Sequence, residues 1–182
     1  MTTPDCPTDP AVDIVVAYTA AMREAFSPDG RCPPTAGSND VRFLAGEGPA
    51  LVAFDVHTRG HGKCKEPMLW VRLARRYRTA AASNSFTPVL DNGTKCDSLP
   101  RVFAIEVGVA RCSVATDERS GWDKYEYEAQ QQLDDSWRLE LALCRAAGKL
   151  RALRHEVASD VLNPVGPDGG IVAWIGTAYI RI

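Results

Sequence analysis

Apolar and more polar residues alternate along the segment from residue 171 to residue 182. One set of alternate positions is apolar and comprises Val172, Trp174, Ala178, Ile180 and Ile182. The positions between them become more polar along the segment, through Thr177, Tyr179 and Arg181. A period of two is typical of a β-strand that buries one face. We therefore predict a closing strand that is an integral part of the sheet, so that C-terminal truncation would prevent folding.

Two other segments carry apolar residues at helical spacing. In the first, Asp9 is the predicted N-cap and Pro10 the first helical residue, because proline lacks an N–H that would lie unpaired there. The apolar stripe that follows consists of Ile14, Val15, Tyr18, Met22 and Ala25. A longer helix is predicted from about residue 123 to residue 147, with Gly148 just beyond its end. Its predicted core-facing residues are Leu133, Trp137, Leu141 and Cys144.

Three further segments have the alternation of strands, at residues 50–56, 68–79 and 101–112. On one predicted face of the second segment lie Leu69, Val71, Leu73 and Tyr77. On its other predicted face lie Arg72, Ala74, Arg76 and Arg78. Residues 157–164 are predicted to pair with the closing strand across the glycine-rich turn at residues 166–170.

The order helix, three strands, long helix and terminal hairpin predicts an α+β fold. The links between strands read as hairpins, so we expect a mostly antiparallel sheet of about four to five strands. This sheet would pack against the N-terminal helix and the long helix, and it would close on a C-terminal β-hairpin strand. At 182 residues the chain is expected to form a single domain, 1–182. Long loops are predicted at about residues 28–40, 57–67 and 80–100.

Composition and charge exclude several classes of function. The chain is 45% apolar and 24% charged, as globular domains usually are. Its net charge of −2 gives no excess of positive charge that would indicate binding to nucleic acid or a membrane surface. The apolar runs are far shorter than the ~20 residues of a membrane span, and the N-terminus lacks the pattern of a secretion signal. We therefore expect synthesis in the cytoplasm and no membrane partner.

No standard catalytic or nucleotide-binding motif occurs, and the chain has only three histidines. We therefore predict that the protein is not an enzyme and has no catalytic, cofactor or metal site. One alternative stays open, because His57, His61 and Cys64 lie within eight residues and Cys96 offers a fourth ligand for zinc. Their spacing matches no standard zinc motif. A zinc-stabilised binding module is kept as the alternative.

The six cysteines contain no Cys-x-x-Cys pair. Cys112 and Cys144 have apolar neighbours and are expected to be buried. The other four, Cys6, Cys32, Cys64 and Cys96, are expected in loops. There they would form disulfides only in an oxidising environment, and the sequence leaves that question open.

Arginines form the other candidate site. Arg72, Arg76 and Arg78 are predicted to share a face, with Arg75 across the sheet, and arginine at that density suits phosphate contact. A second basic cluster, Arg145, Lys149, Arg151 and Arg154, follows the long helix. Acidic stretches at residues 123–128 and 134–140 balance both groups. We therefore favour solvated surfaces over a nucleic-acid interface.

Four segments together resemble a known family. They are CKEPMLWVRL at 64–73, RVFAIEVGVARC at 101–112, AQQQLDDSWRLELALC at 129–144 and PVGPDGGIVAW at 164–174. This succession resembles the tail terminator proteins of long-tailed bacteriophages of actinobacteria, which act at the head–tail junction. The resemblance covers about residues 60–182. The chain departs from the family at Ile171, where relatives often carry a cysteine, so a disulfide partner implied by the family is missing there.

The resemblance implies a structural virion protein without catalysis. Such a protein is a subunit of a homo-oligomeric ring, typically a hexamer, that caps the tail tube and joins it to the head-side connector. Its expected partners are further copies of itself, the tail tube protein and the connector or stopper protein, with DNA only passing through the channel. Its expected location is the virion tail at the head–tail junction, after assembly in the host cytoplasm. On this reading Arg72, Arg76 and Arg78 would face the lumen or a neighbouring subunit. Another neck component, a head-completion or stopper protein, remains the runner-up.

Overall fold

The structure is a computed structural model that describes residues 8–45, 53–60, 64–80, 86–90, 99–114 and 121–182. Within these residues the fold is α+β, as the sequence predicts, with three helices and a six-stranded, mostly antiparallel sheet. None of the described helices is both long enough and apolar enough to cross a membrane.

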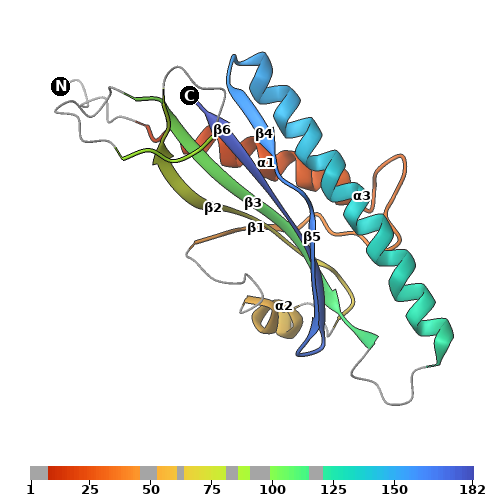
Figure 1. Cartoon of the computed structure of the whole chain (residues 1–182). Coiled ribbons are helices and arrows are strands. Elements are labelled where there is room, and N and C mark those ends of the chain that lie inside the picture. Colours follow the sequence, from red (N-terminus) through yellow and green to blue (C-terminus); the bar gives the residue numbers. More distant parts are fainter. Residues whose placement is uncertain (1–7, 46–52, 61–63, 81–85, 91–98, 115–120) are drawn as a thin grey trace, which may run out of the picture.

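Three long strands form the centre of the sheet (Figure 1). They are β2 (Met68–Arg78), β3 (Arg101–Cys112) and β6 (Ile171–Arg181). The short strand β1 (Val41–Leu44) pairs in parallel with β2 at one edge. At the other edge, β4 (Glu156–Ser159) and β5 (Asn163–Asp168) both pair antiparallel with β6. The predicted terminal hairpin is therefore confirmed, and it consists of β5, a turn at Gly169 and Gly170, and β6.

Two helices cover one face of the sheet, which we call the covered face. They are α1 (Ala11–Phe26) and α3 (Trp122–Ala152). The main core lies between these helices and the strands, and its fully buried members include Tyr18, Phe26, Ile105, Leu139 and Ile180. Of the apolar positions predicted for the closing strand, Ala178 and Ile180 belong to this core and Trp174 packs against it. Val172 is buried outside this cluster, and Ile182 lies outside β6 and is exposed. Burial of these aliphatic and aromatic side chains is the main force that holds the helices on the sheet.

On the opposite face, which we call the open face, only one of the described helices packs, and it lies at one end. There the short helix α2 (Phe54–Gly60) packs Phe54 over a second cluster that contains Met68, Trp70, Ala110 and Ala173. The predicted strand at residues 50–56 is therefore wrong from Phe54 onward, while residues 50–52 lie outside the described residues. A short apolar run is compatible with either a strand or a buried helix. Here the helix places Phe54 in contact with Trp70 and its neighbours. Strand β1, at 41–44, was not predicted.

The long helix differs from its prediction at its end. Gly148 lies inside α3, which continues to Ala152. Glycine within a helix costs about 1 kcal/mol relative to alanine. Burial of Leu150, which is 1% exposed, draws the helix past Gly148 onto the core. The local stop signal is overridden by packing.

Two arginines lock the helix layer to the sheet and to residues 28–40. Arg111 of β3 makes a bidentate ion pair with Asp135 of α3, at 2.5 and 2.7 Å, and also donates to the Ala36 carbonyl. Arg138 of α3 donates to the carbonyl of Ala25, near the C-terminal end of α1, at 2.8 Å. A cation at that end is favourable because the last helical carbonyls are unpaired and partially negative. Residues 28–40 contain no helix or strand, as predicted, but these contacts hold them against the helices.

Candidate functional site

A β-bulge divides the arginines of β2 between the two faces of the sheet. Pairing with β3 shifts between Leu73 and Arg75, so that one extra residue is inserted into β2. Arg72 pairs with Glu106 on the open face, and Arg75 pairs with Ala104 on that same face. After the bulge Arg76 pairs with Phe103 on the covered face. The prediction that Arg72, Arg76 and Arg78 share one face is therefore wrong.

Arg76 and Arg78 make contacts within the chain. Arg76 forms an ion pair with Asp9, and its guanidinium lies 5.4 Å from the centre of the Phe103 ring. The carboxylate of Asp9 also accepts from the Ala11 N–H at 3.0 Å. The helix begins at Ala11 with Pro10 at the N-cap position, one residue later than predicted. The hydrogen bond from Arg76 is the main cause that lowers the pKa of Asp9 from its ordinary 3.8. Arg78 donates to the Leu99 carbonyl at 2.8 Å.

Arg72 belongs to a hydrogen-bonded group on the open face. Glu106 accepts from the Trp70 indole N–H at 2.9 Å and from the Arg72 guanidinium at 2.6 Å. The indole ring lies over Gly108, where an added Cβ would come within 2.1 Å of it. Glycine at 108 therefore allows the Trp70 ring to lie flat across β3 and reach the carboxylate. The charge of Arg72 is balanced by Glu106.

Beyond this group the open face is hollowed by a cavity of about 540 Å³, which we call the open-face hollow. Arginine and aromatic side chains dominate its wall, whose members are Arg72, Ala74, Arg75, Tyr77, Phe86, Pro88, Ala104, Glu106, Thr177 and Tyr179. The Tyr77 hydroxyl donates to the Phe86 carbonyl at 2.6 Å, and the Phe86 and Tyr179 ring centres lie 6.2 Å apart. Burial raises the pKa of the Tyr77 phenol, and Tyr179 adds to this effect while Arg75 opposes it. Guanidinium groups beside aromatic rings suit carboxylate and aromatic side chains of a partner.

Sequence reasoning missed most of this wall. Only Arg72 was a predicted site residue, and the contributions of Arg75, Tyr77 and Tyr179 follow from the bulge and from the pairing of β2, β3 and β6. The local sequence indication of this wall was the combination of tyrosine and arginine within residues 75–79. The structure brings Arg72 and Arg75 together, and it places Arg76 and Arg78 on the other face.

The outer side of α3 is apolar where the sequence predicted a core. Leu133 is 73% exposed and Trp137 is 56% exposed, and Cys144 is also exposed. The side that packs on the sheet consists instead of Asp135, Leu139, Ala142, Leu143, Ala146, Ala147 and Leu150. The predicted core-facing line is therefore wrong, because α3 carries two apolar sides and the side with Leu139, Leu143 and Leu150 is the one that packs on the sheet. Such a patch on a surface is typical of an interaction site.

The first turns of α3 are exposed on all sides. Residues 121–127, 129 and 130 are all exposed, and Trp122 is 83% exposed. Figure 1 shows this end of α3 running out past the sheet. Glu128 is the point of attachment, since its carboxylate accepts from the Val114 N–H at 2.6 Å.

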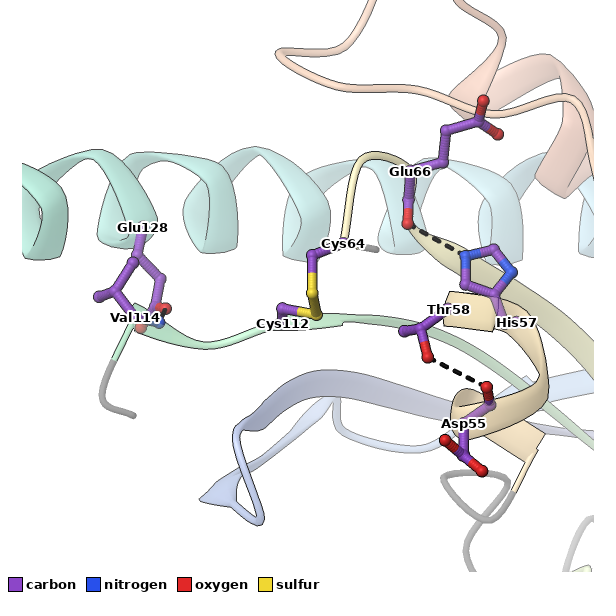
Figure 2. The surroundings of a disulfide bond; sticks show 8 residues. All are labelled: Asp55, His57, Thr58, Cys64, Glu66, Cys112, Val114 and Glu128. Atoms are coloured by element: carbon purple, nitrogen blue, oxygen red, sulfur yellow. Dashed lines mark hydrogen bonds between the residues drawn. A yellow bond between two sulfur atoms is a disulfide. The ribbon is translucent and has the colours of Figure 1, made fainter. Parts of the chain in front are cut away.

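The predicted zinc ligands do not form a site among the described residues, which contain no cluster of three potential ligands. Cys64 is bonded to Cys112 in a disulfide that joins the segment before β2 to the end of β3 (Figure 2). A disulfide sulfur is not a thiolate ligand, so Cys64 is unavailable to zinc in this state. His57 lies on α2 with its Nε2 3.1 Å from the Glu66 carbonyl, while His61 and Cys96 lie outside the described residues.

The cysteines correct a further expectation, and the second basic cluster agrees with one. Cys112 is half-buried in a disulfide and Cys144 is exposed, so neither is the buried free thiol that was expected. In the basic cluster, Arg145 lies 3.5 Å from Glu24 and Arg151 donates to the Val157 carbonyl at 2.8 Å. These contacts agree with a solvated surface rather than a phosphate site.

Comparison with protein-family models finds no match to this chain, and comparison with curated proteins finds none either.

Proposed function

We propose that this protein is a tail terminator-like ring subunit that caps a tail tube and joins it to the head-side connector without catalysis. The observation that carries the proposal is the pair of binding surfaces on opposite sides of the chain: the apolar outer side of α3 and the open-face hollow. A ring subunit needs two different surfaces, because each copy contacts one neighbour with one surface and the other neighbour with the second.

The segments that carry the family resemblance support the same proposal. They correspond to β2, β3, the middle of α3 and the β5–β6 hairpin, which are neighbours in one sheet and its covering helix. The resemblance thus covers a continuous framework rather than scattered loops. The surfaces that a ring needs are built on this framework.

The exposure of large apolar residues supports an assembly role. Trp122, Leu133 and Trp137 lie on one side of α3, each more than half exposed. Tryptophan in particular is enriched at the centres of protein interfaces, where its large surface contributes most of the binding energy. These residues are expected to be buried in the assembled ring, and the tail tube and the connector would then contact its two ends.

The predicted arginines fit an interface better than a channel wall. Arg72 is neutralised by Glu106 and Arg76 by Asp9, so both add little net positive charge to any surface that DNA passes. Arg72 also lines the open-face hollow. We therefore propose that Arg72 serves the contact between subunits, and that Arg76 and Arg78 hold α1 and the segment at Leu99 in place.

Copurification tests this function. The protein should remain bound to tail tubes that are assembled without heads, and electron micrographs should show it at one end of each tube. Binding to DNA-filled heads that are assembled without tails, and no binding to free tubes, would contradict a terminator. That outcome would assign the protein to the head-completion or stopper class instead.

A further inference from the structure

We propose that the exposed first turns of α3 in one copy dock into the open-face hollow of the next copy. This inference rests on the proposed ring function and names the contact that would close the ring. The occupant of the hollow is thus a second copy of the same chain, and its contacting side chains are Trp122 and Glu126.

The start of α3 carries an exposed aromatic surface. Residues 121–127, 129 and 130 are exposed, and Trp122, Tyr125 and Tyr127 are among them. Aromatic side chains bury a large area when they enter an interface, so this part of the helix is suited to contact a partner.

One side of this segment combines an aromatic ring with a carboxylate. Trp122 and Glu126 are four residues apart, so they lie on the same side of α3, and Leu133 continues that side seven residues later. Residues 122–128 include three acidic residues and one lysine, so the segment is acidic.

The open-face hollow complements this pair in shape and in charge. Its volume of about 540 Å³ falls in the range of about 300–1,000 Å³ that encloses a small ligand, which leaves room for an indole ring. Tyr77, Phe86 and Tyr179 supply aromatic walls for such a ring. Arg75 is exposed at the rim, where it can meet a carboxylate. Charge complementarity of this kind favours the α3 segment over a basic or purely apolar occupant.

The two surfaces cannot meet within one chain. The hollow lies on the open face, whereas α3 packs on the covered face and its first turns extend beyond the sheet (Figure 1). The contact is therefore between copies, and it joins unlike surfaces. Repeated contacts between unlike surfaces generate a closed ring when the rotation between copies closes, as the proposed function requires.

Charge reversal in the full-length chain tests the contact. Glu126→Lys and Arg75→Glu should each weaken association by about tenfold or more, measured by analytical ultracentrifugation, and the double variant should regain the wild-type assembly. Trp122→Ala should also weaken it. All three residues are exposed, so circular dichroism should show unchanged folding. Asp13→Lys and Arg31→Glu, which reverse exposed charges away from both surfaces, are the matched controls and should assemble as wild type.

Retention of rings by both single reversals and by Trp122→Ala would overturn the inference, as would a wild-type chain that stays monomeric. Loss of assembly in both single variants without recovery in the double variant would overturn the pairing of Glu126 with Arg75. If these variants assemble normally but no longer bind tail tubes, the tube protein occupies the open-face hollow and the inference is also wrong. Binding of the wild-type protein to tail tubes is measured separately. The proposed function can therefore hold when the proposed contact is wrong, and the contact can hold when the proposed function is wrong.

Discussion

Strand β3 contributes alternate residues to the two faces of the sheet, and the two sets are stabilised differently. Toward the helices it presents Phe103, Ile105 and Val107, which are buried among aliphatic side chains of α1, α3 and the neighbouring strands. Toward the open face it presents Glu106 and Gly108, where hydrogen bonds and a close ring contact fix the geometry. Apolar packing is non-directional and tolerates repacking, whereas the open face depends on particular atoms. The covered face therefore holds the fold together by apolar burial, and the shape of the open face depends on a few specific contacts.

The largest effect is expected when the ion pair between Arg111 and Asp135 on the covered face is broken. Asp135→Ala leaves the Arg111 charge buried and unpaired, so the free energy of unfolding should fall by about 3–5 kcal/mol. Denaturant titration of the purified protein measures this change. Glu140→Ala, an exposed change on the same helix, serves as the control and should have little effect. A loss below about 1 kcal/mol would mean that the pair is not needed for the covered face.

The second prediction concerns the disulfide at the end of the open face. Cys64 and Cys112 are 48 residues apart, and closing a loop of that length stabilises a fold by about 2–4 kcal/mol. Reduction, or the double change Cys64→Ser and Cys112→Ser, should lower the denaturation midpoint accordingly. Cys32→Ser and Cys144→Ser change exposed free thiols and should leave it unaltered. Equal midpoints with and without reductant would contradict the prediction.

Replacement of glycine by alanine should change the stability of the fold in opposite directions at two positions. Gly108→Ala places a methyl group against the Trp70 ring, so it should destabilise the protein by about 1–3 kcal/mol. Gly148→Ala adds a methyl group with nothing within 4 Å inside α3, so it should stabilise by about 0.5–1 kcal/mol. Thermal unfolding of the two variants provides the comparison. Stabilisation by Gly108→Ala would show that Trp70 does not lie over β3.

The smallest expected effect lies just before the start of α1. Because Arg76 lowers the pKa of Asp9, the Asp9 carboxylate stabilises the folded state above its ordinary pKa of 3.8. That contribution is lost as the pH falls through the lowered folded-state pKa. Wild-type protein should therefore lose its stability advantage over Asp9→Asn as the pH drops below about 4. A difference between the two proteins that stays constant from pH 7 to pH 2 would rule out this role for Asp9.

The central strands could be predicted because their periodicity is strong and their neighbours are consistent. Segments 68–79 and 101–112 and the closing strand all lie where the alternation predicts them. A period of two reveals nothing about an inserted residue, however. The bulge before Arg75 reverses the face of every later residue in β2, and this single insertion made the predicted arginine face wrong.

The long helix shows a second limit of sequence reasoning. Hydrophobic spacing identified α3, but it could not tell the side that is buried on the sheet from the apolar side that is exposed. Leu133 and Trp137 lie on the outer side, while Leu139 and Leu143 lie on the side that packs on the sheet. The small residues Ala142 and Ala146 lie between these leucines and allow the helix to approach the sheet closely. Both sides carry large apolar residues, so hydrophobic spacing alone did not identify the core side.

One further consequence follows from the sheet edge formed by β5. Pro164 and Pro167 lie in this strand and have no N–H to offer to another strand. A neighbouring molecule cannot extend the sheet here by continuous main-chain pairing. Copies that meet at this edge have to be held by side chains, which can separate one at a time. On the proposed ring function, a misplaced copy would therefore dissociate before others fixed it in position, and assembly would include the correction of errors.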